Sequence, residues 1–334
     1  MKEYFLEELG VEWYLDFNGQ LDNVPEGWNK LPYIPPAFND DTWEGAEGIE
    51  SLSDVQLAAK GFHSRVQLAQ MAQANPGTLW YIAGEPNRHG FITPTKFASV
   101  YHYYYTTIKN ADPTATIMGP AILNWNFTCL GCIGIQSGQS WLEGVIDPGT
   151  NKREGGFIEK YREKYGTYPP VDVWPIDIYP IDWYNTPNSD FHVDIAVEQI
   201  SEFRQYLNTF PEYVDTPIWI PEIGIHWGYD NWDYDQNYNL IPIGNYHWEK
   251  MGDYLNGVLD WLMANSEAQK IEKWFFLAAW QDIVNPDESA GITMFNILST
   301  DSYLTCLGQI YRNRAMDIQP SGKCHPSGQW ISGE

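Results

Sequence analysis

The chain has 334 residues, 43% of them hydrophobic, so it is long enough to bury a large core, and one α/β domain is expected. With 44 acidic against 19 basic residues its formal charge is −25, which repels phosphate backbones and anionic membrane surfaces. We therefore expect neither nucleic acid nor a membrane as a partner. No apolar run approaches the roughly 20 residues of a membrane-spanning helix, and the opening "MKEYFLEELG" lacks the apolar core of a signal peptide.

Short apolar or aromatic runs recur along the chain, and several are apolar at successive positions, as parallel strands covered on both faces are. In chain order they are VEWYLDF (11–17), LPYIPPAF (31–38), TLWYIAG (78–84), ATIMGPAIL (115–123), VDVWPIDIY (171–179), PIWIPEIGI (217–225) and KWFFLAAW (273–280).

The segments between these runs change to a helical period. After Thr93-Pro94, which resembles an N-cap followed by a first-turn proline, apolar residues recur every three or four positions over 97–108. The same spacing predicts helices over 193–207 and 251–262. Strands that alternate with helices predict a parallel sheet.

Seven such strands favour a single-domain (β/α)8 TIM barrel over residues 1–316. The eighth strand is expected either within 39–77 or in ITMFNIL (292–298). A doubly wound open sheet is the alternative, but no Gly-x-Gly-x-x-Gly follows an early strand. Residues 317–334, with Pro, Gly and Ser, are predicted to form a C-terminal tail.

Four cysteines bear on the cellular compartment. Cys129 and Cys132 form a CxxC, and Cys306 and Cys324 lie near the C-terminus, so two local disulfides would use all four and the second would pin the tail. That pairing predicts a secreted or extracytoplasmic protein. Reduced thiols, a redox CxxC or half a zinc site are the alternatives. Because no second CxxC or His pair at ligand spacing is present, we expect no metal and no cofactor.

Two glutamates occupy the positions where a parallel barrel carries its chemistry, the carboxyl ends of strands. Glu85 follows the run LWYIAG, and Glu222 lies inside IWIPEIGIHW. Burial of an unpaired carboxylate in such apolar surroundings is costly, so each needs a reason. A strand-end Glu paired with an Arg is the structural explanation, but two glutamates placed alike, each beside a proline and among aromatic residues, favour a shared function.

Aromatic residues support a sugar-binding cleft. The chain has 16 Trp, 22 Tyr and 14 Phe, more than a core requires, and several lie at strand ends or in loops. Aromatic rings pack on the flat C–H faces of sugars while polar neighbours reach the hydroxyls. For any single ring, core packing is an equally good explanation. The candidates for substrate binding are Trp125, Trp183, Trp227 and Trp280.

Five segments follow one another along the chain: WYIAGEPN, TPTKFASVYHYYYTTIKNADPTATIMGPAI, VDVWPIDIYPIDW, IWIPEIGIHWG and WFFLAAW. In this order they resemble the retaining glycoside hydrolases of clan A, which are (β/α)8 barrels. The resemblance covers about residues 11–312. It implies that Glu85 is the general acid/base and Glu222 the nucleophile. It further implies that Tyr179 hydrogen-bonds the nucleophile and that Trp280 forms the floor under the reacting sugar.

The sequence departs from that family at two positions. Gly84 stands where the family usually has an Asn that binds the sugar 2-hydroxyl, so Asn87 or Asn124 is expected to replace that contact. Asp177 stands where many relatives have a His, and it is expected to contact substrate as well.

These features predict a monomeric, endo-acting retaining β-glycanase that acts on a neutral polysaccharide or oligosaccharide, since the negative charge disfavours anionic polymers. Retention requires the two carboxyl groups to lie about 5–5.5 Å apart. The alternatives are a carbohydrate-binding barrel without turnover, for which Gly84 is the main support, and a transglycosylase that uses the same two glutamates.

Overall fold

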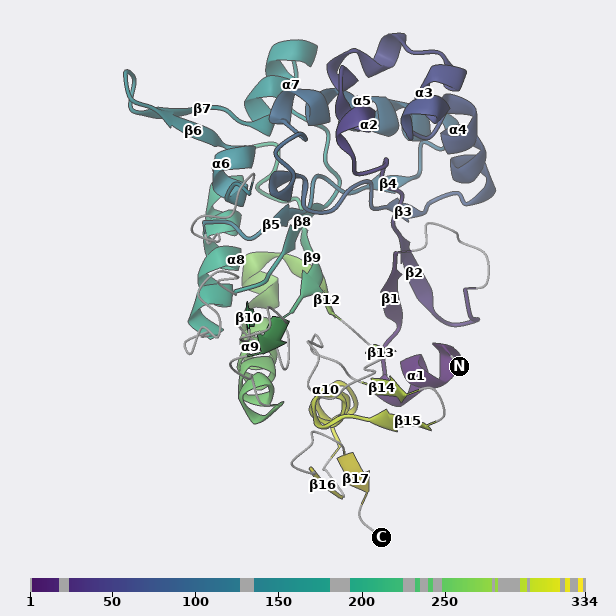
Figure 1. Ribbon diagram of the computed structural model, residues 1–334, viewed down its shortest axis with the longest axis vertical. Coiled ribbons are helices and arrows are strands. Elements are labelled where there is room, and N and C mark those ends of the chain that lie inside the picture. The colour runs from purple at the N-terminus through teal and green to yellow at the C-terminus, as the bar shows by residue number, and fades with distance from the viewer. Residues whose placement is uncertain are drawn as a thin grey trace.

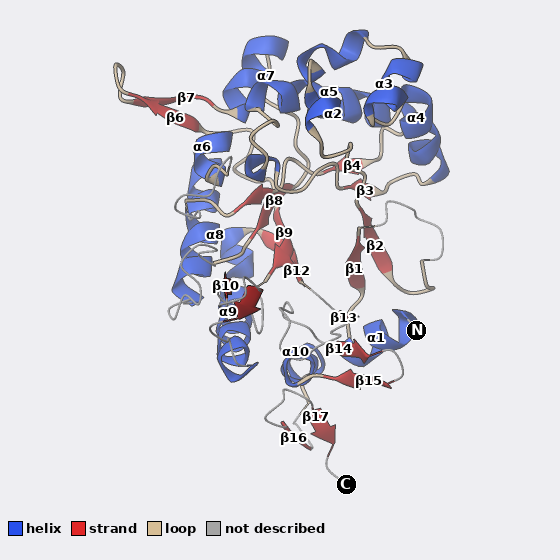
Figure 2. Ribbon diagram, in the orientation of Figure 1, coloured by secondary structure: helices blue, strands red, loops and turns tan. Residues whose placement is uncertain are grey.

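The computed structural model describes residues 2–17, 24–126, 135–180, 193–224, 232–234, 240–242, 248–277, 280–281, 295–298, 301–318, 322–324 and 330–332. Several strands run through the middle of the molecule, and many of the helices lie above and to one side of them, as Figure 1 and Figure 2 show. This is the arrangement expected when a parallel sheet is buried on both faces.

Within the described residues, seven positions of parallel strands follow the chain order, in three sheets that isolated bridges join. They are β1 (Trp13–Asp16), β2 (Asn29–Pro32), β3 (Leu79–Trp80), β4 (Thr116–Ile117) together with β5 (Ile122–Leu123), β8 (Trp174–Asp177), β9 (Ile218–Ile223) and β12 (Ile271–Phe276). Each position pairs in parallel with the next, and β2 reaches β3 through a bridge between Tyr33 and Tyr81. β4 and β5 share one position because Gly119-Pro120 separates them, and proline has no N–H for the ladder.

Each of the seven predicted runs contains part of a parallel strand, but the bounds differ. β2 and β12 each begin two residues before their runs, β2 ends at Pro32, and the run 115–123 holds two short strands. The eighth strand is not found within 39–77, which instead holds the helices α2 (Asp40–Trp43), η1 (Ala46–Ser51), α3 (Asp54–Lys60) and α4 (Arg65–Ala74). The ITMFNIL run contains β14 (Phe295–Leu298), which pairs with β13 (Trp280–Gln281) and β15 (Asp301–Leu304) in a separate sheet. Among the described strands, none is hydrogen-bonded between β12 and β1.

Capping residues in the sequence fix where several helices begin. Thr93 accepts a hydrogen bond from the Lys96 N–H and starts α5 (Pro94–Ala111), as predicted. Ser53 and Ser64 each form a capping box that starts α3 and α4. The other two predicted helices are confirmed as α8 (Val193–Leu207) and α9 (Trp248–Gln269).

The hydrophobic core between the sheet and its helices is rich in aromatic rings. Phe97 on α5 contacts Trp43, Trp141 and Phe157, and all four side chains are buried. Such close packing of large rings fixes α5 against its neighbours. The elements that follow β5 along the chain are α6 (Gly138–Leu142), β6 (Gly144–Asp147), β7 (Lys152–Gly155) and α7 (Phe157–Tyr165), and of these α7 packs on α5. The β6–β7 hairpin projects from the body in Figure 1.

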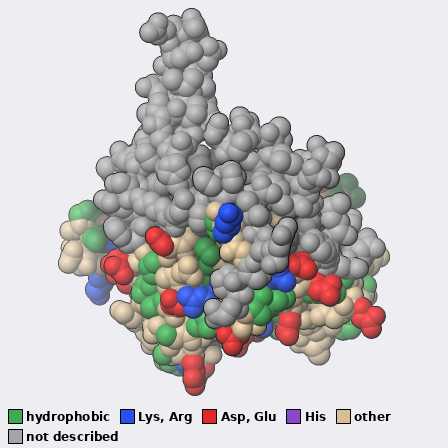
Figure 3. Space-filling view, turned by 90° about the horizontal axis from the view of Figure 1, so that it is seen from below, with side chains coloured by type: hydrophobic (Ala, Val, Ile, Leu, Met, Phe, Trp, Pro, Cys, Tyr) green, Lys and Arg blue, Asp and Glu red, His purple; other side chains and the backbone are tan. Residues whose placement is uncertain are grey.

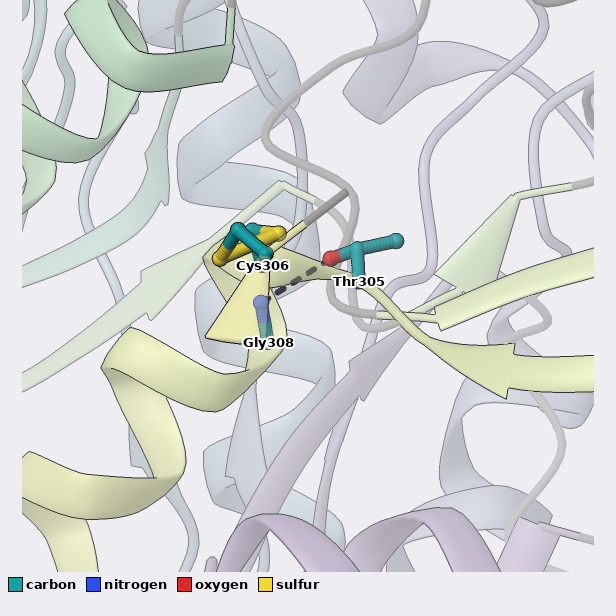
Figure 4. Close-up of a disulfide and its surroundings, with 4 residues drawn as sticks. Thr305, Cys306 and Gly308 are labelled. Atoms are coloured by element: carbon teal, nitrogen blue, oxygen red, sulfur yellow. Dashed lines mark hydrogen bonds between the residues drawn. A yellow bond between two sulfur atoms is a disulfide. The ribbon is translucent and has the colours of Figure 1, made fainter. Parts of the chain in front are cut away.

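The C-terminal part is tied to the body by a disulfide. Cys306, the first residue of α10 (Cys306–Met316), is bonded to Cys324 in β16 (Gly322–Cys324), as predicted, with a Cα–Cα distance of 5.7 Å. Figure 4 shows this bond beside Thr305, whose hydroxyl accepts the Gly308 N–H at 2.9 Å and caps the helix. β16 pairs with β17 (Trp330–Ser332), so the predicted tail contains a hairpin. Cys129 and Cys132 lie outside the described residues.

The remaining described elements are α1 (Lys2–Leu9), which contacts α10, and a hairpin of β10 (Trp232–Tyr234) and β11 (Leu240–Pro242). On the face drawn in Figure 3, acidic side chains are spread over the described surface with a few basic ones between them. Each helix in the described part of the chain is too short or too polar to cross a membrane.

Candidate active site

Glu85 lies where the third position of the sheet ends. Gly84 still forms a bridge with Ala121, and the Glu85 N–H donates to the Ala121 carbonyl at 2.6 Å. Glu85 then adopts a left-handed backbone with φ of 49°, directly before the turn η2 (Pro86–Arg88). That conformation costs a residue with a Cβ about 1 kcal/mol or more, and such strain concentrates at functional sites. The left-handed residue and the proline turn the chain at the strand end.

Glu222 lies near the carboxyl end of β9, three sheet positions after Glu85. The hydroxyl of Tyr179 donates to Glu222 Oε2 at 2.6 Å, the contact that the resemblance implies. Gly224 makes room for this tyrosine, because a Cβ at position 224 would lie 2.5 Å from the Tyr179 ring. Tyr179 is in turn held by Asn124, whose Oδ1 accepts the Tyr179 N–H at 2.8 Å.

The two glutamates face one cavity of about 700 Å³. Its walls combine the two carboxyl groups with aromatic and apolar side chains and one arginine, which suits an amphipathic ligand such as a sugar. The described residues that line it are Phe17, Tyr33, Phe38, Gly84, Glu85, Arg88, His89, Leu123, Ile135, Tyr179, Glu222 and Leu277.

Burial shifts the ionisation of both glutamates. Burial is the main cause that raises the pKa of Glu222 to about 7; the charge of Glu85 adds to the rise and the hydrogen bond from Tyr179 opposes it. Burial also raises the pKa of Glu85, against the charge of Arg88, whose guanidinium lies 3.1 Å from Glu85 Oε2. The charge of Glu85 therefore makes Glu222 hold its proton to higher pH than an isolated carboxyl group would.

The two glutamates have different hydrogen-bond partners. Tyr179 is buried and donates a short hydrogen bond, which stabilises the ionised form of Glu222. Arg88 stabilises ionised Glu85, but 58% of its side chain is exposed, so water screens this ion pair. The partner of Glu222 is thus buried, and the partner of Glu85 is exposed to solvent.

The raised pKa of Glu222 predicts how the free energy of unfolding depends on pH. Because its pKa is about 7 in the folded protein and 4.5 ordinarily, the folded state binds the proton more tightly, and stability is lost as pH rises from about 4.5 to 7. At 1.36 kcal/mol per unit this amounts to at most about 3 kcal/mol. Glu222→Gln should therefore exceed wild type in free energy of unfolding at pH 8 and lose that advantage near pH 4.5, as measured by urea titration.

The matched control is Glu198→Gln, since Glu198 is exposed on α8 and the change removes the same charge. It should leave the free energy of unfolding nearly equal to that of wild type at both pH values. An advantage of Glu222→Gln that is the same at pH 4.5 and pH 8 would contradict the assignment of the raised pKa.

Asn87 and Asn124, both expected to contact substrate, are buried and bind backbone instead. The Asn87 amide donates to the carbonyls of Leu123 and Gln136 and accepts the Leu123 N–H at 2.8 Å. Asn124 forms a reciprocal pair with the backbone of Tyr179. Both side chains therefore support the loops that carry Glu85 and Tyr179, whereas the sequence predicted a contact with the sugar.

Trp125 and Asp177 also differ from the predicted contacts. Trp125 is 2% exposed and packs on Phe203 and Tyr206 of α8, so its ring belongs to the core. Asp177 is fully buried beneath the cavity, where burial and the charges of Glu222 and Glu85 raise its pKa well above the ordinary value. It is a buried neighbour of the two glutamates.

Trp183 and Trp227 lie outside the described residues. Trp280 begins β13, and nothing further about its side chain is described. Their predicted roles in substrate binding stay predictions.

The sequence analysis missed Tyr33, Arg88, Phe38 and His89. Arg88 follows Glu85 by three residues, a spacing that brings two side chains together across one turn. Tyr33 lies two residues before Pro35-Pro36, near the end of its strand, and neighbouring parallel strands end at the same edge of a sheet. Phe38 stacks on His89, with ring centroids 5.0 Å apart, and no local sequence pattern predicts this contact.

No protein-family model matches the chain, and no curated protein matches it. Among solved structures, the chain is similar to a family 1 β-glucosidase from Thermotoga maritima, with a TM-score of 0.54 at 10% identity over 94% of this chain and 84% of that one. A β-glucosidase from the same organism in complex with deoxynojirimycin gives 0.51 at 12% identity, over 94% and 85%. At these identities the likeness shows the fold alone, the α/β fold of the TIM barrels.

A third similar structure is an endo-β-1,3-glucanase of glycoside hydrolase family 128 from Amycolatopsis mediterranei in complex with laminaripentaose. Its TM-score is 0.48 at 15% identity, over 92% of both chains. Because this score is below 0.5, the fold assignment rests on the two β-glucosidases.

Proposed function

We propose that this protein is a retaining glycoside hydrolase that cleaves β-glycosidic bonds of a neutral polysaccharide or oligosaccharide. The observation that carries the proposal is the cavity that Glu85 and Glu222 share, with Tyr179 bonded to one and Arg88 to the other. Two carboxyl groups with different partners are what acid catalysis and nucleophilic attack at one anomeric carbon require. Aromatic and apolar walls suit the C–H faces of a sugar.

In the proposed mechanism protonated Glu85 donates its proton to the leaving oxygen while the Glu222 carboxylate attacks the anomeric carbon. The glycosidic C–O bond breaks, and a bond forms between the anomeric carbon and Glu222. Glu85, now ionised, takes a proton from water, and the resulting hydroxide attacks the anomeric carbon and releases Glu222. Two inversions leave the sugar with its original configuration.

The test is a panel of xylan, mannan, galactan, mixed-linkage β-glucan and β-1,3-glucan with their oligosaccharides, scored by chromatography. We expect one class to release oligosaccharides, in agreement with endo action, and proton NMR to show the β anomer first. Initial release of the α anomer would contradict retention and place the carboxyl groups about 6.5–9.5 Å apart. Ligand-induced changes in Trp fluorescence without products would identify a binding protein, and products longer than the substrate would identify a transglycosylase.

Tyr179→Phe tests the partner of the proposed nucleophile. Loss of the hydroxyl that donates to Glu222 at 2.6 Å should lower kcat by about 10- to 100-fold, the range of a hydrogen bond to a charged group. Because this hydrogen bond lowers the pKa of Glu222, its loss should also move the acidic limb of the kcat/KM profile to higher pH.

The control is Tyr105→Phe, which removes a hydroxyl from a half-buried residue of α5 that does not line the cavity. It should leave both kcat and the pH profile at wild-type values. A Tyr179→Phe enzyme with reduced kcat but an unmoved acidic limb would indicate a structural role for the tyrosine.

A further inference from the structure

Tyr33 lies directly after β2, beside Glu85 and Glu222. It lines the same cavity and is half-buried. Its ring contacts that of its bridge partner Tyr81, with centroids 4.8 Å apart, and meets Phe17 edge-on at 5.6 Å. Rings on both sides therefore hold the Tyr33 ring in place.

The Tyr33 hydroxyl is oriented by the backbone that leads to Glu85. Its oxygen accepts the Gly84 N–H at 3.3 Å, and a phenol that accepts one bond still has its own hydrogen to donate. Burial raises the pKa of Tyr33 well above its ordinary value, and the charges of Asp177, Glu222 and Glu85 act in the same direction. The hydroxyl is thus a hydrogen-bond donor at neutral pH.

Gly84 is required by the two tyrosines. A Cβ at position 84 would lie 2.6 Å from the Tyr81 hydroxyl and 3.6 Å from the Tyr33 hydroxyl. The Tyr81 hydroxyl is itself held beneath the cavity, where it donates to Asp177 Oδ2 at 3.4 Å. The space that a side chain before Glu85 would fill is therefore occupied by tyrosine hydroxyls.

We propose that Tyr33 contacts the substrate: its hydroxyl donates a hydrogen bond to a hydroxyl of the sugar whose anomeric carbon faces Glu222. The inference rests on the proposed function and adds a residue that recognises the sugar. Among the described residues that line the cavity, Tyr33 and Tyr179 carry the neutral hydroxyl groups, and the Tyr179 hydroxyl donates to Glu222. The amides of Asn87 and Asn124 are engaged with backbone.

The test combines Tyr33→Phe with aryl β-glycosides that each lack one sugar hydroxyl. On the parent glycoside, kcat/KM should fall about 10- to 100-fold, the effect of a lost hydrogen bond at a site of developing charge. On the one deoxy substrate that lacks the contacted hydroxyl, Tyr33→Phe and wild type should have equal kcat/KM. Tyr105→Phe should match wild type on every substrate.

An equal loss on every deoxy substrate, or no loss on the parent, would overturn the proposal and leave Tyr33 a structural residue. If the wild-type protein hydrolyses no glycoside, the proposed hydrolase function is wrong, but the Tyr33 contact can still be tested. Calorimetry then compares the binding of parent and deoxy methyl β-glycosides to wild type and to Tyr33→Phe. There, weaker binding of the parent glycoside alone by Tyr33→Phe supports the contact. Binding unchanged by Tyr33→Phe, or no binding by wild type, overturns it.

A second pair of variants tests the placement of the hydroxyls independently of sugar chemistry. Gly84→Ala should lower the midpoint of thermal unfolding, because the new Cβ meets the Tyr81 hydroxyl. Adding Tyr81→Phe removes that oxygen and leaves the nearest ring carbon at 3.5 Å, an ordinary contact, so the double variant should recover part of the loss. Losses that simply add would contradict the arrangement on which the proposal depends.

Discussion

Glu222→Ala is expected to lower kcat/KM on the glycan substrate by on the order of 10⁴-fold or more, the scale of losing a covalent nucleophile. Glu222 lines the cavity and accepts the Tyr179 hydroxyl at 2.6 Å, and in the proposed mechanism it forms the glycosyl ester. The measurement is steady-state hydrolysis, with Glu198→Gln as the control that removes a carboxylate from the surface.

Added azide tests more specifically whether Glu222 is the nucleophile. In Glu222→Ala the space of the missing carboxylate admits azide, which attacks the anomeric carbon of an activated β-glycoside in a single displacement. The product should be an α-glycosyl azide, with inverted configuration. A β-glycosyl azide, or a Glu222→Ala enzyme with near wild-type turnover, would contradict the assignment of Glu222 as nucleophile.

Glu85→Ala is expected to cost about 10²- to 10⁴-fold on a natural glycan, the usual contribution of general acid–base catalysis. On a dinitrophenyl glycoside, whose leaving group needs no proton, the first step should stay fast. The second step lacks its base, so a burst of dinitrophenol should precede slow turnover. Stopped-flow absorbance measures both phases.

Azide distinguishes the two glutamates. In Glu85→Ala it attacks the covalent intermediate on Glu222, so it should accelerate turnover and give a β-glycosyl azide with retained configuration. The pair of variants should thus yield azides of opposite configuration from one substrate. If Glu85→Ala slows dinitrophenyl and natural substrates equally and shows no burst, Glu85 is not the general acid.

Residues whose role depends on local pattern were predictable from the sequence. Glu85 and Glu222 interrupt apolar strands at their carboxyl ends, where a barrel places its site, and the structure brings both to one cavity. The Thr93 cap and the helical period of α5 are likewise short-range signals, and both are confirmed. Their catalytic roles stay predictions for the variants above.

Residues whose role depends on long-range approach were not predictable in the same way. Asn87 and Asn124 carry amides that suit a sugar, yet they satisfy backbone groups of loops distant in sequence, including Leu123 and Tyr179. Trp125 was predicted to contact substrate, but its ring packs on Phe203 of α8. Nothing local reveals which partner a polar or aromatic side chain meets.

The sequence by itself determined the alternation of strands and helices, the large acidic charge and the two glutamates, because hydrophobic period, composition and strand-end position are properties of short segments. Only the tertiary structure decided that Tyr33 and Tyr81 fill the space beside Gly84 and how burial shifts the pKa values of the glutamates. Those features arise where neighbouring strands and their loops meet, and close approach, desolvation and charge coupling exist only once the chain has folded.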